Sequence, residues 1–244
     1  MKVLFVIPAY NEEANIENVI KEIKKDVKYA DILIINDCST DNTKKIIENN
    51  NVKCITGIFN LKYAWAVQTG IKYAYQNDYD YVIQFDADGQ HIAKEAEKLL
   101  NEMKKSNVDI VIGSRFLKDT GYKHPFFKKI ATKLFTLIIK IFCKQEITDP
   151  TSGFQCLNKK VIEYYSKMGN YPEYPDANLI IDVLLKGYTI KEISVKMRLR
   201  EAGESMHGGI IKPIKYMINM IYTITVTLII NAMRGRKKWK IFIL

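Results

Sequence analysis

Short apolar runs alternate with segments of helical period through the first half of the chain, and no other feature constrains the fold as strongly. The runs have the length of single buried strands and lie at residues 2–7, 32–35, 52–58, 81–85 and 109–112. Between the first two runs, Ile16, Val19, Ile20 and Ile23 recur at the spacing of one helix face. Strands that alternate with helices predict an α/β fold with a mostly parallel sheet and right-handed connections.

Helical periodicity continues through the rest of the chain. Helices are expected at residues 64–75, 94–105, 125–144, 159–167 and 177–186, and an edge strand at 189–195. Residues 216–233 contain no charged side chain but include two Asn and three Thr. We therefore expect this last segment to be a helix that lies in a membrane interface rather than one that spans the bilayer.

Composition narrows the class of protein. A chain of 244 residues fits one large domain, alone or with a small appendage, and its 26% of charged residues argues against a fully membrane-embedded protein. The four cysteines have no paired metal-ligand spacing, and the N-terminus has no signal-peptide pattern. We expect reduced thiols and a cytoplasmic location.

The net charge of +10 is concentrated in two apolar-rich segments. Residues 123–144 hold six lysines and no acid, and residues 206–244 hold seven cations and no acid, which leaves the rest of the chain at −3. The first segment has a predicted apolar side formed by Phe127, Ile130, Leu134, Leu137, Ile138 and Ile141. Cations interleaved with apolar residues at helical spacing favour an anionic membrane surface over a nucleic acid as the partner.

Two carboxylates follow the apolar run 81–85, at Asp86 and Asp88. Ligands bind beyond the carboxyl ends of parallel strands, and paired carboxylates suit Mg²⁺ or Mn²⁺. A solvated turn is the structural alternative, since Asp and Gly favour turns. An aspartyl phosphatase would carry this run near the N-terminus with Thr following, and a calcium loop would need Gly at His91. The pattern favours a metal site for a phosphate-bearing substrate, with His91 in a structural role.

Three other polar segments, at residues 8–12, 36–41 and 113–115, also follow predicted strands. Together with residues 86–91, and in this order, they resemble the family-2 glycosyltransferases of the GT-A fold, a Rossmann-like architecture. The resemblance covers about residues 2–206, and it is greatest to the branch of dolichyl-phosphate mannosyltransferase and the bacterial polyprenyl-phosphate glycosyltransferases.

The resemblance implies a role for residues in each segment. For the nucleotide-sugar donor it implies contacts at Pro8, Ala9, Tyr10, Glu12, Asp37, Asp86 and Ala87. For the metal it implies Asp86, Asp88 and Gln90. For the acceptor it implies Arg115, Lys128, Lys129, Arg200 and Ser205, the last two in an Arg-x-x-Gly-x-Ser element. For catalysis it implies Asp88, Arg115, Asp149 and Arg200.

Structural interpretations stay open for several of these positions. Asn11 and Asp41 are expected to cap helices rather than contact ligand. Arg200 is equally consistent with a surface charge on an edge strand. Asp149 is either a catalytic or positioning acid or the cap of a turn, and Asp176 is a weaker candidate of the same kind.

The sequence departs from the family pattern after the third strand. Lys62, Ala64 and Trp65 stand where glycines are usual, so the loop is expected to differ in backbone from that of the family. Gln155 stands where Arg is common. These departures leave the identity of the donor open.

The predicted protein is an inverting, metal-dependent glycosyltransferase at the cytoplasmic membrane face, which moves a hexose from a UDP- or GDP-sugar to a polyprenyl phosphate. Residues 1–206 would form the catalytic domain, and residues 207–244 a membrane-associated amphipathic helix and basic tail, peripheral or anchoring. One alternative is transfer to a hydroxyl of a lipid-linked or cell-surface glycan, with Asp149 or Asp176 as base. Another is a membrane-bound scaffold of the same fold that has lost turnover.

Overall fold

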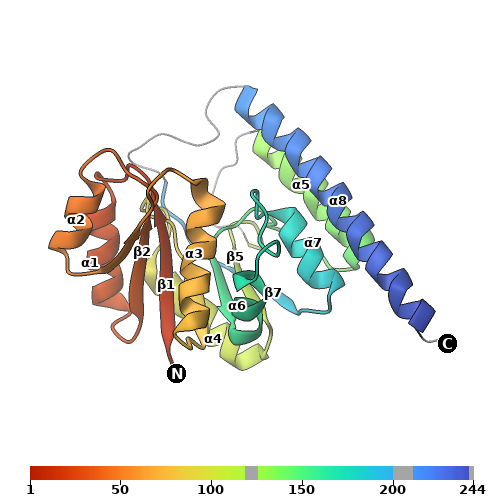
Figure 1. Ribbon diagram of the computed structural model, residues 1–244, viewed down its shortest axis with the longest axis horizontal. Coiled ribbons are helices and arrows are strands. Elements are labelled where there is room, and N and C mark those ends of the chain that lie inside the picture. Colours follow the sequence, from red (N-terminus) through yellow and green to blue (C-terminus); the bar gives the residue numbers. More distant parts are fainter. Residues whose placement is uncertain (119–125, 200–210, 242–244) are drawn as a thin grey trace.

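The computed structural model contains one seven-stranded sheet with helices on both faces (Figure 1). It describes residues 1–118, 126–199 and 211–241, with the side chains of 126–128, 211–214 and 234–241 excepted. The boundary predicted between residues 206 and 207 lies outside the described residues.

The strand order is β3-β2-β1-β4-β6-β5-β7. The strands are β1 Val3–Ala9, β2 Asp31–Asn36, β3 Lys53–Thr56, β4 Tyr81–Gln84, β5 Ile110–Ser114, β6 Gln155–Asn158 and β7 Ile190–Ser194. Every pair is parallel except the two that β6 makes with β4 and β5. The mostly parallel sheet and the edge position of the last strand confirm the sequence prediction.

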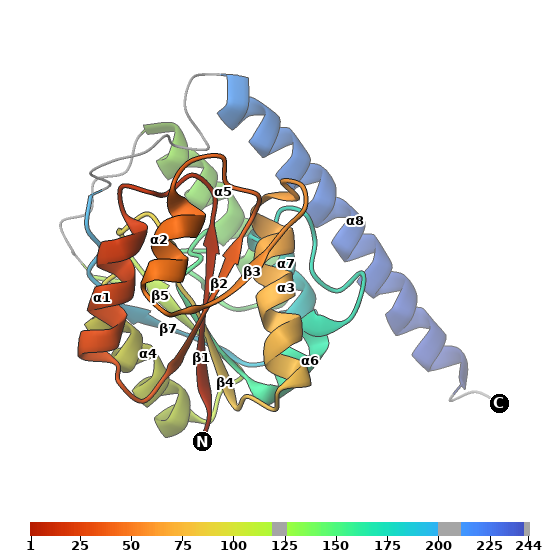
Figure 2. The same cartoon turned by 60° about the vertical axis from the view of Figure 1, so that its left-hand side comes forward.

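The helices separate into two layers. They are α1 Ile16–Asp26, α2 Thr43–Asn49, α3 Lys62–Gln76, α4 Ala93–Ser106, α5 Phe126–Cys143, α6 Lys159–Ser166, α7 Ala177–Leu185 and α8 Ile211–Ile241. Figure 2 shows α1, α2 and α4 on one side of the sheet and α3 and α6 on the other. All seven residues of β1 are buried: Val3, Phe5 and Ile7 pack toward α1 and α4, while Leu4 and Val6 pack toward α3. A strand buried on both faces has no polar alternation, which is why the sequence shows a continuous apolar run.

Two predicted local features differ in the structure. The third strand ends at Thr56, and Ile58 beyond it is 84% exposed. Asn11 does not cap α1, because the helix begins at Ile16; instead the Asn11 side-chain oxygen accepts a hydrogen bond from the Thr40 N–H at 2.8 Å.

The helix α5 carries two apolar stripes. Phe135 and Ile139 are buried in the core and were absent from the predicted apolar side. On that predicted side, Ile130, Leu137 and Ile141 are 49%, 53% and 61% exposed. The helix therefore packs with one stripe and presents the other to its surroundings.

The helix α8 runs along the side of the molecule away from α1 and α2 (Figures 1 and 2). It packs on α7 and buries Met220 and Ile224. Its segment Lys215–Met233 is long and apolar enough to cross a membrane by length and composition, and only 11% of the tested window is buried.

Candidate active site

The predicted site segments converge at the carboxyl edge of the parallel strands. Ala9 pairs with Asn36 across β1 and β2, and Val6 pairs with Gln84 across β1 and β4. The loops that follow these strands therefore begin side by side. Residues 8–12, 36–41, 86–91 and 113–115 all lie at this edge.

Three contacts fix Asp86 at the end of β4. Its backbone N–H donates to Nδ1 of His91 at 3.0 Å, and Oη of Tyr63 donates to its carboxylate oxygen Oδ1 at 3.2 Å. The other carboxylate oxygen lies 3.6 Å from His91 Nε2. His91 is 4% exposed and stacks on Phe154 with ring centroids 4.4 Å apart. Burial lowers the pKa of His91 to about 4, so the ring is neutral and acts as a fixed hydrogen-bond acceptor. This fits the structural role expected from the sequence.

The donor set around Asp86 fits a divalent ion that is shared with a diphosphate. Asp88 Oδ1 accepts the Gln90 N–H at 3.0 Å, and Gly89 between them forms a turn with φ +76°. The Gln90 side-chain NH₂ donates to the Arg198 carbonyl at 3.4 Å, which leaves its amide oxygen as the atom that could bind a metal. Within the described ranges, no three His, Cys, Asp or Glu side chains form a metal-ligating group. Two carboxylates and an amide are nevertheless what Mg²⁺ or Mn²⁺ needs from a protein when substrate phosphates supply further oxygens.

Asp37 has backbone partners in the structure. It is 6% exposed, and its two carboxylate oxygens accept the N–H groups of Leu61 and Lys62 at 2.8 and 2.7 Å. In this way Asp37 fixes the loop between β3 and α3. The ligand contact predicted for it stays a prediction.

Lys62, one of the residues at the usual glycine positions, has a left-handed backbone. Its φ is +70°, a region that favours glycine, and its N–H donates to Asp37 Oδ2 at 2.7 Å. The expected difference from the family's loop backbone stays a prediction. Ala64 is buried at the start of α3, whereas Trp65 is 51% exposed.

The first strand-end loop is tied to the second. The Glu12 N–H donates to Thr43 Oγ1 at 2.8 Å, and the Asn11 N–H donates to Ser39 Oγ at 3.0 Å. Ala9 is buried and Tyr10 is 46% exposed beside it. These hydrogen bonds hold the loop 8–12 in place, and Tyr10 is its exposed aromatic residue.

Arg115 and Asp149 form a buried bidentate ion pair. Arg115 Nε and Nη2 each donate to one Asp149 carboxylate oxygen at 2.7 Å, and the Arg115 backbone N–H adds a third bond at 3.0 Å. Asp149 is fully buried, and its own N–H donates to Glu192 on β7. Because both of its oxygens face the guanidinium, Asp149 orients Arg115 and is poorly placed to accept a substrate proton.

Asp176 is a second acid on which the charges of Arg115 and Asp149 act. It precedes α7, is half-buried, and accepts a 2.7 Å hydrogen bond from Oη of Tyr216 on α8. Burial raises its pKa to about 6, while Tyr216 and Arg115 act in the opposite direction and Asp149 adds to the rise. Sequence reasoning missed Tyr63 and Tyr216, because no local motif shows that either hydroxyl reaches a carboxylate far away in the chain.

Some predicted acceptor residues lie outside the described part of the chain. Arg200, Ser205 and the Lys128 side chain belong to this group. Lys129 is described and is exposed on α5.

Comparison with known proteins identifies the family. The sequence model described as Glycosyl transferase family 2 matches residues 4–166. The chain belongs to this family. It is therefore a glycosyltransferase, and the predicted family is confirmed.

Two relatives and one solved structure illustrate the likeness. The chain is 28% identical over 213 residues to the UDP-N-acetylglucosamine–dolichyl-phosphate N-acetylglucosaminyltransferase of Methanococcus voltae, covering 80% of this chain and 84% of that protein. It is 30% identical over 220 residues to the dolichol-phosphate mannosyltransferase of Pyrococcus furiosus, covering 86% and 60%. The glucosyl-3-phosphoglycerate synthase of Mycobacterium tuberculosis, solved with Mn²⁺, UDP-glucose and phosphoglyceric acid, superposes with a TM-score of 0.66 at 16% identity, covering 93% and 79%. This last likeness confirms the GT-A fold.

Proposed function

We propose that the protein transfers a hexose from a UDP- or GDP-sugar to a polyprenyl phosphate, with inversion at the sugar carbon and with a bound Mg²⁺ or Mn²⁺. The observation that carries the proposal is the placement of Asp86, Asp88 and Gln90 at the same strand edge as Arg115, which is locked by Asp149. The two relatives named above, whose names specify dolichyl phosphate, support the acceptor class.

Each group of site residues has its own role in the proposed reaction. Asp86, Asp88 and Gln90 would hold the metal, which when bound offsets the negative charge that builds on the departing diphosphate. Arg115 is held in one orientation by Asp149, as a planar donor for a phosphate oxygen. The sugar carbon is attacked by a phosphate oxygen that is already ionised near neutral pH, so the reaction needs no strong general base.

Transfer to a glycan hydroxyl is the second candidate function. The half-buried Asp176 favours it, because a carboxylate with a pKa of about 6 suits a general base. Asp149 does not support it, since both of its oxygens are bound to Arg115. The scaffold alternative, which was motivated by the replaced glycines at Lys62, Ala64 and Trp65, predicts no product with any donor.

We place the enzyme at the cytoplasmic face of the membrane, with α5 and α8 as the docking surface. The exposed apolar residues of these two helices are Ile130, Leu137, Ile141, Phe142, Ile218, Ile221, Ile229, Ile230 and Met233. Lysines on α5 lie beside this surface, as expected for contact with anionic lipid headgroups. The basic residues 234–240 would extend the contact.

A direct assay tests the proposal. The purified full chain is incubated with UDP- or GDP-hexoses, Mn²⁺, and either a polyprenyl phosphate or a glycan acceptor. We expect product on the lipid phosphate; product on a hydroxyl alone would establish the second function instead.

The metal assignment needs its own variant. Asp88→Asn should reduce turnover and Mn²⁺ binding by roughly 100-fold or more, since even the outer partners of a metal site are worth about 10–100-fold. Asp78→Asn, whose side chain is 79% exposed in the loop before β4, is the matched control. Equal activity of the two variants would overturn the metal site.

A further inference from the structure

Tyr216 in the first turns of α8 contacts Asp176, the acid that precedes α7. Its ring packs edgewise on Phe135 of α5 and on Tyr174, with centroids 6.4 Å away in each case. These contacts direct its hydroxyl to Asp176, which accepts a hydrogen bond of 2.7 Å. The C-terminal helix therefore contacts a carboxylate of the site and does not merely lie against the domain.

Asp176 is not used as a helix cap. Although it precedes α7, its side chain makes no capping hydrogen bond. Instead, its backbone N–H donates to Tyr174 O at 3.1 Å and to Asn178 Oδ1 at 3.2 Å, which fixes the main chain, while its carboxylate accepts the Tyr216 hydroxyl. A helix-capping role does not account for this arrangement.

The charged and titratable groups around Asp176 come from several elements. They are Arg115 after β5, Asp149 after α5, Tyr63 on α3, Tyr171 before α7, and Tyr216 on α8. Arg115 and the Tyr216 hydroxyl favour the ionised carboxylate, whereas burial and Asp149 oppose it. The charges of the Arg115–Asp149 ion pair therefore act on Asp176.

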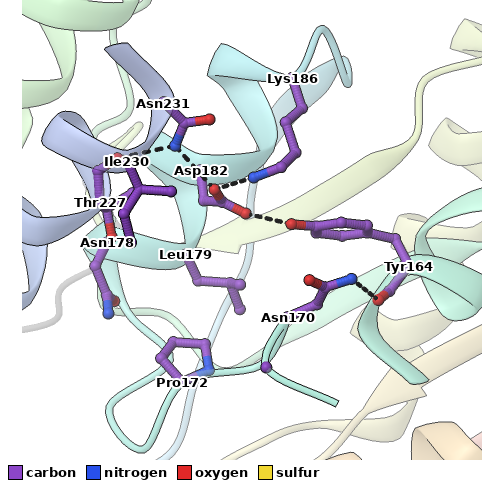
Figure 3. Close-up of a pocket in the computed structure, with 11 residues that line it drawn as sticks. Tyr164, Asn170, Pro172, Asn178, Leu179, Asp182, Lys186, Thr227, Ile230 and Asn231 are labelled. Carbon is purple, nitrogen blue, oxygen red and sulfur yellow. Dashed lines mark hydrogen bonds and ion pairs between the residues drawn. The ribbon is translucent and has the colours of Figure 1, made fainter. Parts of the chain in front are cut away.

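A second polar contact holds α8 independently of Tyr216. Figure 3 shows a pocket in which Asn231 of α8 points to Asp182 of α7. Asp182 accepts hydrogen bonds from Asn231 at 3.0 Å and from Oη of Tyr164 at 2.6 Å, and pairs with Lys186. Together with the buried Met220 and Ile224, this contact should keep α8 seated when the Tyr216 hydroxyl is removed.

We propose that Tyr216 is a positioning residue of the active site. Its hydroxyl holds the Asp176 carboxylate in the part of the site where Arg115 binds the acceptor phosphate, so that α8 takes part in acceptor recognition as well as in membrane docking. This inference rests on the proposed function, because that function assigns Arg115 to the acceptor. Most of the residues predicted to bind only the donor lie at the ends of β1 and β2 or directly after them, and we expect donor binding to be unaffected by a change at Tyr216.

Steady-state kinetics tests the acceptor role. Tyr216→Phe should raise the acceptor KM about tenfold, the size expected for one hydrogen bond to a charged group, and leave the donor KM within about twofold of wild type. Tyr222→Phe, a tyrosine of the same helix that is 68% exposed, should change neither. An unchanged acceptor KM in Tyr216→Phe, or an equal rise in both constants, would overturn the proposal.

A titration distinguishes this inference from the proposed function. Asp176 is followed by ¹³C NMR in protein labelled at the aspartate carboxyl carbon, with Asp176→Asn used to identify its signal. Because the hydroxyl stabilises the charged form, the midpoint should lie near pH 6 in wild type and Tyr222→Phe and at higher pH in Tyr216→Phe. An unchanged midpoint would refute the coupling. If wild type makes no product on polyprenyl phosphate, the proposed function fails, and the titration still decides whether α8 controls Asp176.

Discussion

The buried pair between Arg115 and Asp149 provides a strong quantitative test of the site, through the substitution Asp149→Asn. Asp149 is fully buried, and the Arg115 side chain is 15% exposed. The substitution keeps the shape of the side chain but removes its charge and turns an NH₂ group toward the guanidinium. The Arg115 guanidinium is then left buried without a negatively charged partner.

The loss of stability can be estimated from the geometry. Removing one partner of a buried ion pair costs about 3–5 kcal/mol, and the retained amide oxygen favours the lower end, about 3 kcal/mol. At roughly 2–4 °C per kcal/mol for a chain of this size, Tm should fall by about 6–12 °C. The same substitution at Asp78 breaks a 3.2 Å pair with Lys159 in which both side chains are mostly exposed, and it should cost less than about 1 kcal/mol.

Thermal unfolding followed by circular dichroism measures both variants. The double variant Arg115→Met/Asp149→Leu should recover most of the stability, because two apolar groups leave no buried charge unpaired, yet it should remain inactive. If Asp149→Asn melts no lower than Asp78→Asn, the pair does not hold this part of the site, and the role given to Asp149 is refuted.

Two further predictions concern the loop after β3 and the floor of the site. Lys62→Gly should raise the free energy of unfolding by about 1 kcal/mol. Glycine removes the strain of the left-handed backbone at this position, about 1–2 kcal/mol, and this gain exceeds the cost of the entropy that glycine adds to the unfolded chain, about 0.4–1 kcal/mol. A lower Tm in the variant would contradict the strain at φ +70°. Gly153→Ala would place Cβ 2.7 Å from the Tyr63 hydroxyl and displace it from Asp86. Calorimetry should show Mn²⁺-dependent donor binding weakened about tenfold in Gly153→Ala and similarly in Tyr63→Phe, and wild-type affinity in both would exclude this support of Asp86.

The order and type of the main elements could be predicted because each depends on local periodicity. Apolar runs that are buried on both faces, such as β1, identify parallel strands without any knowledge of their partners. The position of β6 could not be predicted in this way. Its four residues pair antiparallel between β4 and β5, far from their sequence neighbours, and only tertiary packing selects that place.

The same distinction between local signals and distant contacts applies to the site residues. Asp86, Asp88 and Arg115 were found because each follows a strand directly, and the sheet carries all such positions to one edge. What each carboxylate does there depends on partners distant in sequence: Asp149 is engaged by Arg115, whereas Asp176 is engaged by Tyr216. In the sequence, both acids were possible bases. The structure separates them, since Asp149 bonds the Arg115 guanidinium with both carboxylate oxygens, whereas Asp176 accepts a hydrogen bond from the Tyr216 hydroxyl. The role of each acid therefore depends on which donor reaches it, and these donors come from elements distant in sequence: the end of β5 for Asp149 and α8 for Asp176.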